Sequence, residues 1–487
     1  MPDLDKDLKS IQEARDLSTR AFAAWKTWST ASQQEVDTVC EAMATAALDA
    51  SERLGIMAHE ETGYGVPEHK RLKNEFASRT VWESIKDLKT VGVINHDPVK
   101  KVYEIAWPVG VIAALTPSTN PTSTVMFKIL VAIKTRNAII IAPHPAAARC
   151  CYETTRIMSQ AAIDHGAPPG LVSCLQHISL DGTQALMHHK YVALILATGG
   201  TPMVRAAHST GKPAIGVGPG NVPVYVDRSA DLEKAARYIV ASKALDYSTI
   251  CATEQSVVAD APIAQKLKTL MQREGAYFTN AQETERLRKL LFYPDGTMNT
   301  AVVGKSADFV AAIAGVDIPR GTRIMVTHLQ KTGKEEPLSR EKLTTVLGWY
   351  EEEGWEAGCE RCIELIQFGG RGHSLIIHAT DQEVIMAFGL EKPVFRIGVN
   401  VMGTLGAIGF TTGVMPSMTL GAGGVGGSIT GDNVSAVHLM NVKRLAYELS
   451  PPPAAVMVPG QPKPGPTPGE IEKAVQEAVE EILNYHS

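Results

Sequence analysis

Continuous apolar runs alternate with helix-like segments through the middle of the chain. The runs lie at 110–115, 137–142 and 191–198, and the helix-like segments lie at 122–135, 145–165 and 201–210. The runs are rich in β-forming residues, and strands that are buried on both faces of a sheet have this continuous apolar character. The alternation therefore predicts a parallel, doubly wound α/β sheet.

The flanking regions have different patterns. Residues 1–90 place apolar positions at helical spacing among many charged residues, which predicts amphipathic helices leading into the first domain. A second α/β block is expected from about Asp231 to Phe395, after a hinge near Asp227. Its predicted strands are SVVAD at 256–260, TAVVG at 300–304, TRIMVTH at 322–328 and SLIIHA at 374–379.

The C-terminal region changes composition twice. Residues 396–450 are rich in glycine, which indicates close approach of the backbone to a ligand or to another chain. Residues 451–469 contain eight prolines and predict an extended linker. Residues 470–487 predict a short amphipathic helix, because Ile471, Val475, Val479, Ile482 and Leu483 fall on one helical face with glutamates opposite.

Composition narrows the class of protein. The chain has 487 residues, 44% of them hydrophobic, and a single core rarely serves more than about 300 residues. The formal charge of −5 lacks the basic excess that nucleic acid binding requires. The sequence shows no apolar stretch of the ~18 residues that span a membrane and no apolar signal core at its start. We therefore expect a multidomain cytoplasmic protein with neither nucleic acid nor membrane as a partner.

The seven cysteines are odd in number and scattered, unlike a disulfide framework. Cys359 and Cys362 form a CxxC, but no second pair completes a zinc ligand set, so no metal site is expected. Cys150 and Cys151 open a helix-like segment and are expected to pack in the core. At most one or two cysteines are therefore expected to carry chemistry.

Five fragments carry most of the chemical information. They are TPSTNP at 116–121, ATGG at 197–200, GVGPGN at 216–221, STICATEQS at 248–256 and EKL at 341–343. In this order they resemble the aldehyde dehydrogenase superfamily in its CoA-acylating branch, and in particular the aldehyde-oxidising half of bifunctional aldehyde–alcohol dehydrogenases. The resemblance extends from about Glu60 to Arg444. It implies an aldehyde dehydrogenase-like α/β fold, with a doubly wound cofactor domain at 1–230, a catalytic domain at 231–415, and a return to the cofactor domain with an oligomerisation segment at 416–450.

The resemblance places the catalytic nucleophile at Cys251. A thiolate adds to an aldehyde to give a thiohemiacetal, which can expel hydride and leave a thioester. The oxyanion of this adduct requires positioned donors, and by resemblance these are the Asn120 side chain and the Cys251 backbone N–H. Without the other fragments, Cys251 would be interpreted as a buried structural cysteine and Asn120 as a turn former beside Pro121.

The resemblance also implies NAD or NADP as cofactor and CoA as co-substrate. The residues expected at the cofactor are Leu115, Thr116, Pro117, Ser118, Thr119 and Asn120 on the nicotinamide side, Gly200 near the pyrophosphate, Gly218 beside the reacting centre, Glu341 on the nicotinamide ribose, and Leu420. His144, in a segment that lacks the ribose-binding lysine of the hydrolytic branch, would line the adenosine pocket or be a surface histidine. His373 would assist CoA or the cysteine, or be a structural histidine.

One departure from the hydrolytic branch selects the product. Hydrolytic aldehyde dehydrogenases have a glutamate that activates water, and this position falls on Val217, which cannot take a proton. A thiol such as CoA needs less help, because thiols ionise near pH ~8.5. The sequence therefore favours an acyl-CoA product over a carboxylic acid. The alternatives are a hydrolytic aldehyde dehydrogenase, and a protein that keeps an inactive dehydrogenase fold and acts through its tail.

Substrate and partners are expected from the last segments. The stretch 399–410, which resembles the loop over the aldehyde, has no charged residue and favours a short uncharged aldehyde, although folding could bring Arg371 or Arg396 close. A homo-oligomer is expected, since the superfamily pairs subunits through the segment around 433–450. The helix at 470–487 resembles the peptides that dock enzymes into bacterial microcompartments through shell proteins. The alternative is that it packs on its own oligomer.

Overall fold

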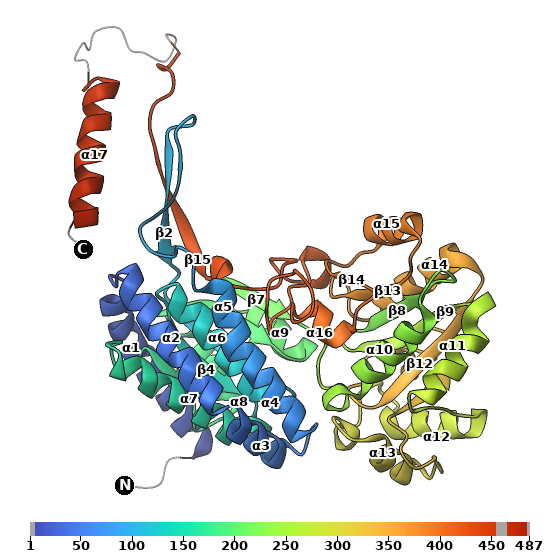
Figure 1. The fold of residues 1–487 in the computed structure, drawn as a ribbon. Helices are drawn as coiled ribbons and strands as arrows, with labels where there is room; N and C mark the ends of the chain where they lie inside the picture. The colour runs from blue at the N-terminus through green and yellow to red at the C-terminus, as the bar shows by residue number, and fades with distance from the viewer. Residues whose placement is uncertain (1–4, 454–464, 485–487) are drawn as a thin grey trace.

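The computed structural model describes residues 5–453 and 465–484, and it has two lobes that each contain a parallel sheet (Figure 1). The five-stranded sheet of the first lobe has the order β5-β4-β3-β6-β7. Its strands are β3 (Val111–Thr116), β4 (Ala138–Pro143), β5 (Val172–Cys174), β6 (Val192–Thr198) and β7 (Ala214–Val217). Strands β3 and β4 are buried at every position. The three apolar runs thus form the strands predicted from them.

Helices cover this sheet and pack on one another (Figure 1). They are α1 (Lys6–Trp28), α2 (Gln33–Asp49), α3 (Ser51–Thr62), α4 (Pro67–Glu75), the π-helix η1 (Phe76–Thr80), α5 (Val81–Ile85), α6 (Pro121–Lys134), η2 (Pro145–Ala147), α7 (Ala148–Asp164), α8 (Leu180–His188) and α9 (Thr201–His208). Every residue of α6 is buried, because this helix lies between the sheet and the N-terminal helices. The helical entry predicted for residues 1–90 is confirmed.

The second lobe contains a seven-stranded parallel sheet of order β10-β11-β12-β9-β8-β13-β14. Its strands are β8 (Val222–Val226), β9 (Glu254–Asp260), β10 (Ala276–Phe278), β11 (Ile324–His328), β12 (Val346–Glu352), β13 (Leu375–His378) and β14 (Ile397–Val399). Its helices are α10 (Leu232–Ala244), η3 (Leu245–Ser248), α11 (Ala261–Arg273), α12 (Ala281–Leu291), η4 (Thr300–Val302), α13 (Ala307–Ala314), η5 (Pro337–Ser339), α14 (Gly354–Phe368) and α15 (Gln382–Glu391).

Two details of the second lobe differ from the expectation. The predicted strand TAVVG is not a strand, because the Asn299 side chain accepts a hydrogen bond from the Ala301 N–H at 3.1 Å and caps the 3₁₀ turn η4. The hinge lies before Asp227, since β8 pairs with β9 and β13 and the chain has already changed sheets between Val217 and Val222. Continuous apolar strands suit either sheet, so local sequence could not fix this boundary.

The chain returns to the first lobe after β14. It passes through α16 (Gly403–Ala407), η6 (Gly424–Gly426) and η7 (Ala436–Leu439). Leu420, Val434 and Leu439 are buried in the same hydrophobic core as β3 and α6. The Asn137 side chain donates to the Leu439 carbonyl at 2.7 Å, which fixes the returning segment to the start of β4. The glycine-rich region therefore completes the first lobe.

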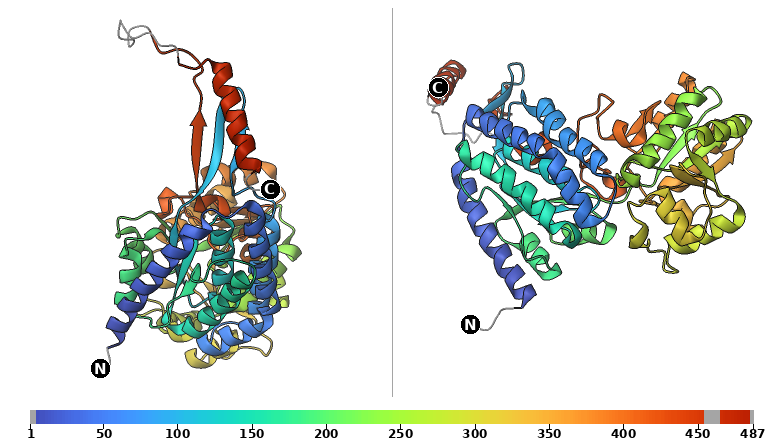
Figure 2. Two further views of the ribbon diagram at one scale, coloured as in Figure 1. Left: turned by 90° about the vertical axis from the view of Figure 1, so that its left-hand side faces the viewer. Right: turned by 60° about the horizontal axis from the view of Figure 1, so that its bottom comes forward.

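A three-stranded antiparallel arm extends from the first lobe (Figure 2). It contains β1 (Val93–Asp97), β2 (Val102–Pro108) and β15 (Met440–Ala446), with β2 in the centre. Helix α17 (Pro468–Asn484) lies alongside the arm in Figures 1 and 2. Linker residues 454–464, the chain end at 485–487 and the side chains of Ile482 and Leu483 lie outside the described part of the chain.

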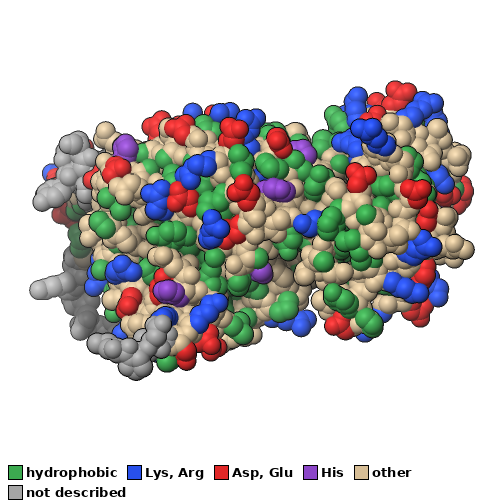
Figure 3. All heavy atoms as spheres, turned by 90° about the horizontal axis from the view of Figure 1, so that it is seen from below, with side chains coloured by type: hydrophobic (Ala, Val, Ile, Leu, Met, Phe, Trp, Pro, Cys, Tyr) green, Lys and Arg blue, Asp and Glu red, His purple; other side chains and the backbone are tan. Residues whose placement is uncertain are grey.

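The surface shows basic and acidic side chains interspersed over the face drawn in Figure 3. Among the described residues, every helix is too short or too polar to cross a lipid bilayer.

Candidate active site

A cavity of about 250 Å³ lies between the two lobes. It lies at the carboxyl ends of β3 and β6, the edge of a parallel α/β sheet where ligands usually bind. Ten of the residues expected from the sequence line it, namely Pro117, Ser118, Thr119, Asn120, His144, Gly200, Gly218, Cys251, Glu341 and Leu420. Leu115 and Thr116 are not among its lining residues and are buried within β3. Folding thus brings together segments that are more than two hundred residues apart.

Cys251 lies in the loop between η3 and β9 and is half-buried. Three successive residues before it, Asp246, Tyr247 and Ser248, have left-handed backbone conformations with φ between 48° and 67°. Gly220 packs directly against it, because a Cβ on Gly220 would lie 2.2 Å from the Cys251 carbonyl oxygen. The cysteine backbone is therefore fixed on one side by a strained turn and on the other by glycine.

The Cys251 thiol is neutral in this environment. Burial raises its pKa to about 12, and the Glu341 carboxylate acts in the same direction. Arg396 and the N–H groups of Cys251 and Ala252 favour the thiolate and partly offset these effects. The same backbone N–H groups that favour a thiolate can also donate to an oxygen anion beside the sulfur.

Asn120 immediately precedes α6 and is 8% exposed. Its Nδ2 donates to the Thr249 carbonyl at 2.9 Å and to Thr119 Oγ1 at 3.2 Å, while its Oδ1 accepts from Lys73 Nζ at 2.6 Å. The amide group therefore presents its N–H side towards the segment that carries Cys251. This is the orientation that an oxyanion donor requires.

Glu341 supplies the one carboxylate among the described residues that line the cavity. Its Oε1 accepts from the Gly220 N–H at 2.8 Å, which leaves Oε2 available to a ligand hydroxyl. Burial raises its pKa to about 7, against the Gly220 N–H and the positive charges of Lys243 and Lys342. A carboxylate held in this way suits the hydroxyl groups of a ribose.

The opposite end of the cavity suits the rest of a dinucleotide. Gly199 and Gly200 link β6 to the N-terminus of α9, where backbone N–H groups and the helix dipole favour phosphate. His144 follows β4, lines the same cavity, and accepts from the Ala146 N–H at 3.2 Å through Nδ1. Burial lowers the His144 pKa, which favours the neutral imidazole at this side of the cavity. The residues present therefore fit a nicotinamide dinucleotide.

His373 lies behind the cavity instead of lining it. It is 1% exposed, its Nδ1 lies 3.1 Å from Ser374 Oγ, and its Nε2 has no hydrogen-bond partner in the described structure. Burial and the neighbouring Arg396 lower its pKa to about 3. A Cβ on Gly220 would lie 3.0 Å from its ring, so His373 packs against the same glycine as the Cys251 carbonyl. His373 is thus a neutral group one layer behind Cys251.

Val217 lines the cavity at the end of β7 and is 1% exposed. The position at which hydrolytic enzymes have a base is thus occupied by an apolar side chain that faces the cavity. The described residues contain no group of three or more His, Cys, Asp or Glu side chains that could hold a metal ion.

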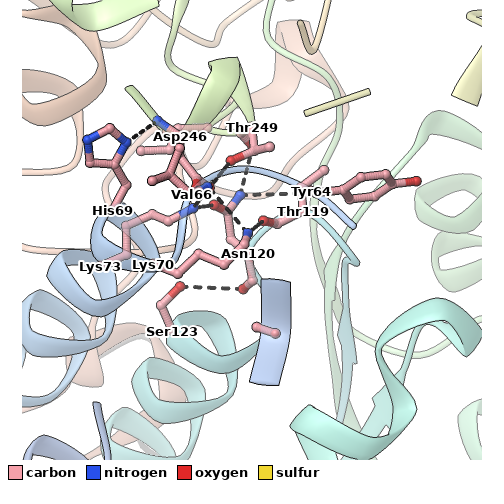
Figure 4. Close-up of polar contacts among 12 residues, drawn as sticks. Tyr64, Val66, His69, Lys70, Lys73, Thr119, Asn120, Ser123, Asp246 and Thr249 are labelled. Carbon is pink, nitrogen blue, oxygen red and sulfur yellow. Dashed lines mark hydrogen bonds and ion pairs between the residues drawn. The ribbon is translucent and has the colours of Figure 1, made fainter. Parts of the chain in front are cut away.

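A cluster of buried charged residues behind Asn120 was not predicted from the sequence. Lys70 and Lys73 of α4 and Asp246 of η3 are all buried and interact with one another (Figure 4). The segment PEHKRLKNE has the composition of a solvent-exposed helix. The spacing of residues within it cannot show that Lys73 faces a carboxylate 173 residues away in the sequence. Arg396, one of the two arginines that folding could bring close to the aldehyde, donates to the carbonyls of Gly421 and Gly431 and favours the Cys251 thiolate.

Comparisons with known proteins agree with this geometry. Residues 5–282 match the aldehyde dehydrogenase family. The chain is 42% identical to an aldehyde-alcohol dehydrogenase of Streptococcus pneumoniae over 82% of its own length and 46% of that protein's, so it spans about half the length of this relative. It is 47% identical to the structure of an acetylating aldehyde dehydrogenase from Geobacillus thermoglucosidasius, with a TM-score of 0.91 over 92% of this chain and 99% of that one.

Two propionaldehyde dehydrogenase structures are similar at 27% identity and TM-scores of 0.80. One is from a fucose utilisation microcompartment of Clostridium phytofermentans and covers 88% of this chain and 96% of its own. The other, from Rhodopseudomonas palustris, holds CoA and an acylated cysteine and covers 89% of this chain and 97% of its own. The family match, the similar structures and the assembled cavity agree, and the chain belongs to the aldehyde dehydrogenase family, among its acylating members.

Proposed function

We propose that this protein oxidises an aldehyde to an acyl-CoA, with a nicotinamide dinucleotide as hydride acceptor and a thioester on Cys251 as intermediate. The observation that carries the proposal is the pairing of Cys251 and Asn120 on one cavity whose hydrolytic position is the apolar Val217. The Rhodopseudomonas palustris relative with CoA and an acylated cysteine supports the same chemistry.

The acylation half proceeds at Cys251. The Cys251 thiol first loses its proton to solvent. The thiolate sulfur then forms a bond to the aldehyde carbon, and the carbonyl oxygen becomes an oxyanion held by Asn120 Nδ2–H and the Cys251 backbone N–H. The hydride of this carbon would pass to a nicotinamide dinucleotide bound in the cavity as the oxyanion re-forms a carbonyl, so that a thioester remains on Cys251. Glu341 would hold the ribose of that cofactor.

The second half transfers the acyl group. The CoA thiolate adds to the thioester carbon, the same two donors hold the new oxyanion, and the carbon–sulfur bond to Cys251 breaks, giving acyl-CoA and the Cys251 thiolate. A water molecule would need a base at this point, and Val217 supplies none. The proton of the CoA thiol is lost without such a base because thiols ionise near pH ~8.5.

We infer that NAD is preferred to NADP. The cavity lining contains no lysine or arginine among the described residues, and a 2′-phosphate is usually recognised by such side chains. We infer in addition a short, uncharged aldehyde. The cavity wall beside Cys251 is formed by Ile408, Met418 and Leu420, and Arg396 is already held by carbonyl oxygens.

We also propose a homo-oligomer that associates through the arm and the segment 433–450. Val437, Leu445 and Leu449 are large apolar side chains exposed along this segment, and Trp107 of β2 is exposed beside them. Such side chains are usually covered by a partner. Light scattering that gave the mass of one 52.3 kDa chain would exclude this proposal.

The proposed role of α17 is to dock the enzyme into a bacterial microcompartment by contact with shell proteins. Ile471, Val475 and Val479 form an apolar stripe that is only half-buried, and the residues opposite are exposed. A groove of about 150 Å³ separates the helix from the arm and is lined by Ile471, Val475, Tyr103 and Tyr447. The microcompartment origin of the Clostridium phytofermentans relative supports docking. The competing role, packing on the protein's own arm, is supported by the groove itself.

The decisive experiment measures NADH and product from acetaldehyde with and without CoA. We expect sustained NADH formation and acyl-CoA only with CoA present, and at most one NADH per active site without it. Sustained formation of free acid without CoA would identify the hydrolytic activity instead. No NADH in either case would indicate a protein that keeps the fold without the activity.

A further inference from the structure

The structure assigns Lys73 as the positioning residue of Asn120. This inference rests on the proposed function, in which the Asn120 N–H binds the oxyanion. Lys73 Nζ donates to Asn120 Oδ1 at 2.6 Å and is 3% exposed (Figure 4). The two ends of an amide are similar in shape, so their partners decide which end faces a site. An ammonium can only donate, and it therefore directs the oxygen of Asn120 away from the cavity.

The Lys73 ammonium is itself held in place by three hydrogen-bond acceptors. It also contacts the Asp246 carboxylate, and it donates to Thr249 Oγ1 at 3.3 Å, so its three protons have three acceptors. The Val66 N–H donates to the other oxygen of Asp246 at 2.7 Å. Gly65 has φ of 70°, and a Cβ there would collide with the Asp246 side chain. Asp246 is thus fixed by the loop before α4, and it fixes Lys73 in turn.

The cluster carries more positive than negative charge. Lys70 and Lys73 face the single carboxylate of Asp246, and Lys70 Nζ lies 3.3 Å from Asp246 Oδ2. His69 accepts from the Asp246 N–H at 2.9 Å, and burial lowers its pKa, so it adds no charge near neutral pH. Burying an uncompensated charge is costly. The negative charge that forms on the substrate oxygen beside Asn120 is the partner that this cluster lacks.

The contact also strengthens Asn120 as a donor. A positive charge on the amide oxygen polarises the group and makes its N–H protons better donors. Burial lowers the Lys73 pKa to about 8, with Lys70 adding to this effect and Asp246 opposing it. Lys73 therefore loses its charge as the pH rises through about 8, and the support of the oxyanion should be lost over the same range.

Lys70 provides a matched control on the same helix face. Lys70 contacts the same carboxylate and is 2% exposed. It donates to the Thr119 carbonyl at 3.3 Å and has no hydrogen bond to the Asn120 side chain. Removing either lysine leaves the cluster with one charge fewer. Only the removal of Lys73 frees the Asn120 amide.

The test combines Lys73→Met and Lys70→Met with Asn120→Ala in double-mutant cycles. We expect Lys73→Met to lower the rate of the single-turnover NADH burst, measured without CoA, by roughly tenfold or more, the scale of a hydrogen bond to a charged group. It should cause no further loss in the Asn120→Ala background, because the two residues act as a unit. Lys70→Met should lower the melting temperature similarly, because it removes a partner of the same buried carboxylate, and it should lower the burst rate less than Lys73→Met does.

Additive losses of Lys73→Met and Asn120→Ala, or equal losses for the two lysine variants, would overturn the assignment. If Lys73→Met does not fold, the pH dependence of the burst decides. The ratio of the wild-type burst rate to the Asn120→Ala burst rate should fall as pH rises through about 8, because ionisation of the Cys251 thiol raises both rates alike and only wild type depends on the Lys73 charge. A ratio that does not change with pH would contradict the inference. A wild type that gives no NADH with aldehyde would instead contradict the proposed function.

Discussion

The cavity between the lobes and the C-terminal helix bury their side chains in opposite ways. Behind the cavity, charged groups such as Lys73 and Asp246 are removed from solvent and hydrogen-bonded to one another and to neighbouring polar groups. On α17, the apolar residues Ile471, Val475 and Val479 remain partly exposed. Burial of charge is tolerated only where several elements supply partners, whereas an exposed apolar stripe indicates a surface still to be covered.

This difference separates two roles. Cavity groups depend on contacts from α4, η3, α6 and both lobes, so a change there should affect catalysis strongly. Among its described residues, helix α17 meets the arm at the groove, so a change there should affect association. The predictions below test this separation, beginning with the largest expected effect on turnover.

Replacing Cys251 with alanine should abolish acyl-CoA formation, because the sulfur that forms the thioester is lost. The side chain is half-buried and small, so the melting temperature should change little. Turnover is measured as NADH with aldehyde and CoA, and folding by thermal unfolding. Retention of more than a few per cent of activity would exclude Cys251 as the nucleophile.

Replacing Gly220 with alanine should lower turnover by roughly 10²-fold or more, because the added Cβ would displace the Cys251 backbone and small misplacements of reacting groups have losses of this size. Gly389→Ala is the control, since a Cβ at this position in α15 meets no atom within 4 Å. Wild-type kinetics of both variants would show that the close contact at Gly220 does not position the cysteine.

Replacing Asn120 with alanine should lower kcat by roughly 10²-fold, the effect of removing one oxyanion donor. The KM for the cofactor should change little, because the oxyanion forms on the aldehyde. We would measure kcat and KM by steady-state kinetics, with the cofactor and the aldehyde varied separately. A variant that changes only cofactor affinity would place Asn120 outside the oxyanion site.

Replacing Glu341 with glutamine should raise the KM for NAD by about five- to tenfold through a weaker contact to the ribose.

The Glu341→Gln substitution should also change the stability of the folded protein. The folded-state pKa is raised to about 7, so between about 4.5 and 7 the folded protein retains a proton that the unfolded chain has lost, and stability falls as pH rises. The variant lacks this loss, so its advantage in melting temperature should grow from pH 4.5 to 7 and persist above. An advantage that does not vary with pH would contradict the assigned environment.

Deleting residues 451–487 should leave turnover within about twofold of wild type, because no described side chain of α17 lines the catalytic cavity. Co-sedimentation with shell proteins should be lost. Activity and light scattering of the truncated protein provide the comparison. If the truncated protein loses its oligomeric state or its activity, α17 belongs to the fold and does not act as a docking peptide.

Sequence predicted the first lobe for a simple physical reason. Strands such as β3 and β4 are buried on both faces, and continuous apolar runs of this kind have few other interpretations. The cavity lining was predicted in another way, because Asn120, Gly200 and Cys251 were assigned by resemblance to the aldehyde dehydrogenase superfamily, and all three line one cavity in the structure.

Other features depend on partners that are distant in the sequence. The lysines of α4 are buried only because Asp246 lies opposite, and no pattern within α4 shows this. The predicted strand at 300–304 is a 3₁₀ turn because a single side-chain cap, from Asn299, competes with an apolar run. The position of His373 one layer behind the cavity depends on how closely Gly220 approaches Cys251.

The return of the chain to the first lobe has a consequence for biosynthesis. Strand β2 is synthesised early, but its neighbour β15 (Met440–Ala446) emerges from the ribosome more than three hundred residues later. Until then one edge of β2 is unpaired, and the core of the first lobe lacks Leu420, Val434 and Leu439. Unpaired strand edges and exposed cores favour aggregation. The nascent chain is therefore most vulnerable while the second lobe is being made, and chaperone dependence should be concentrated in that interval.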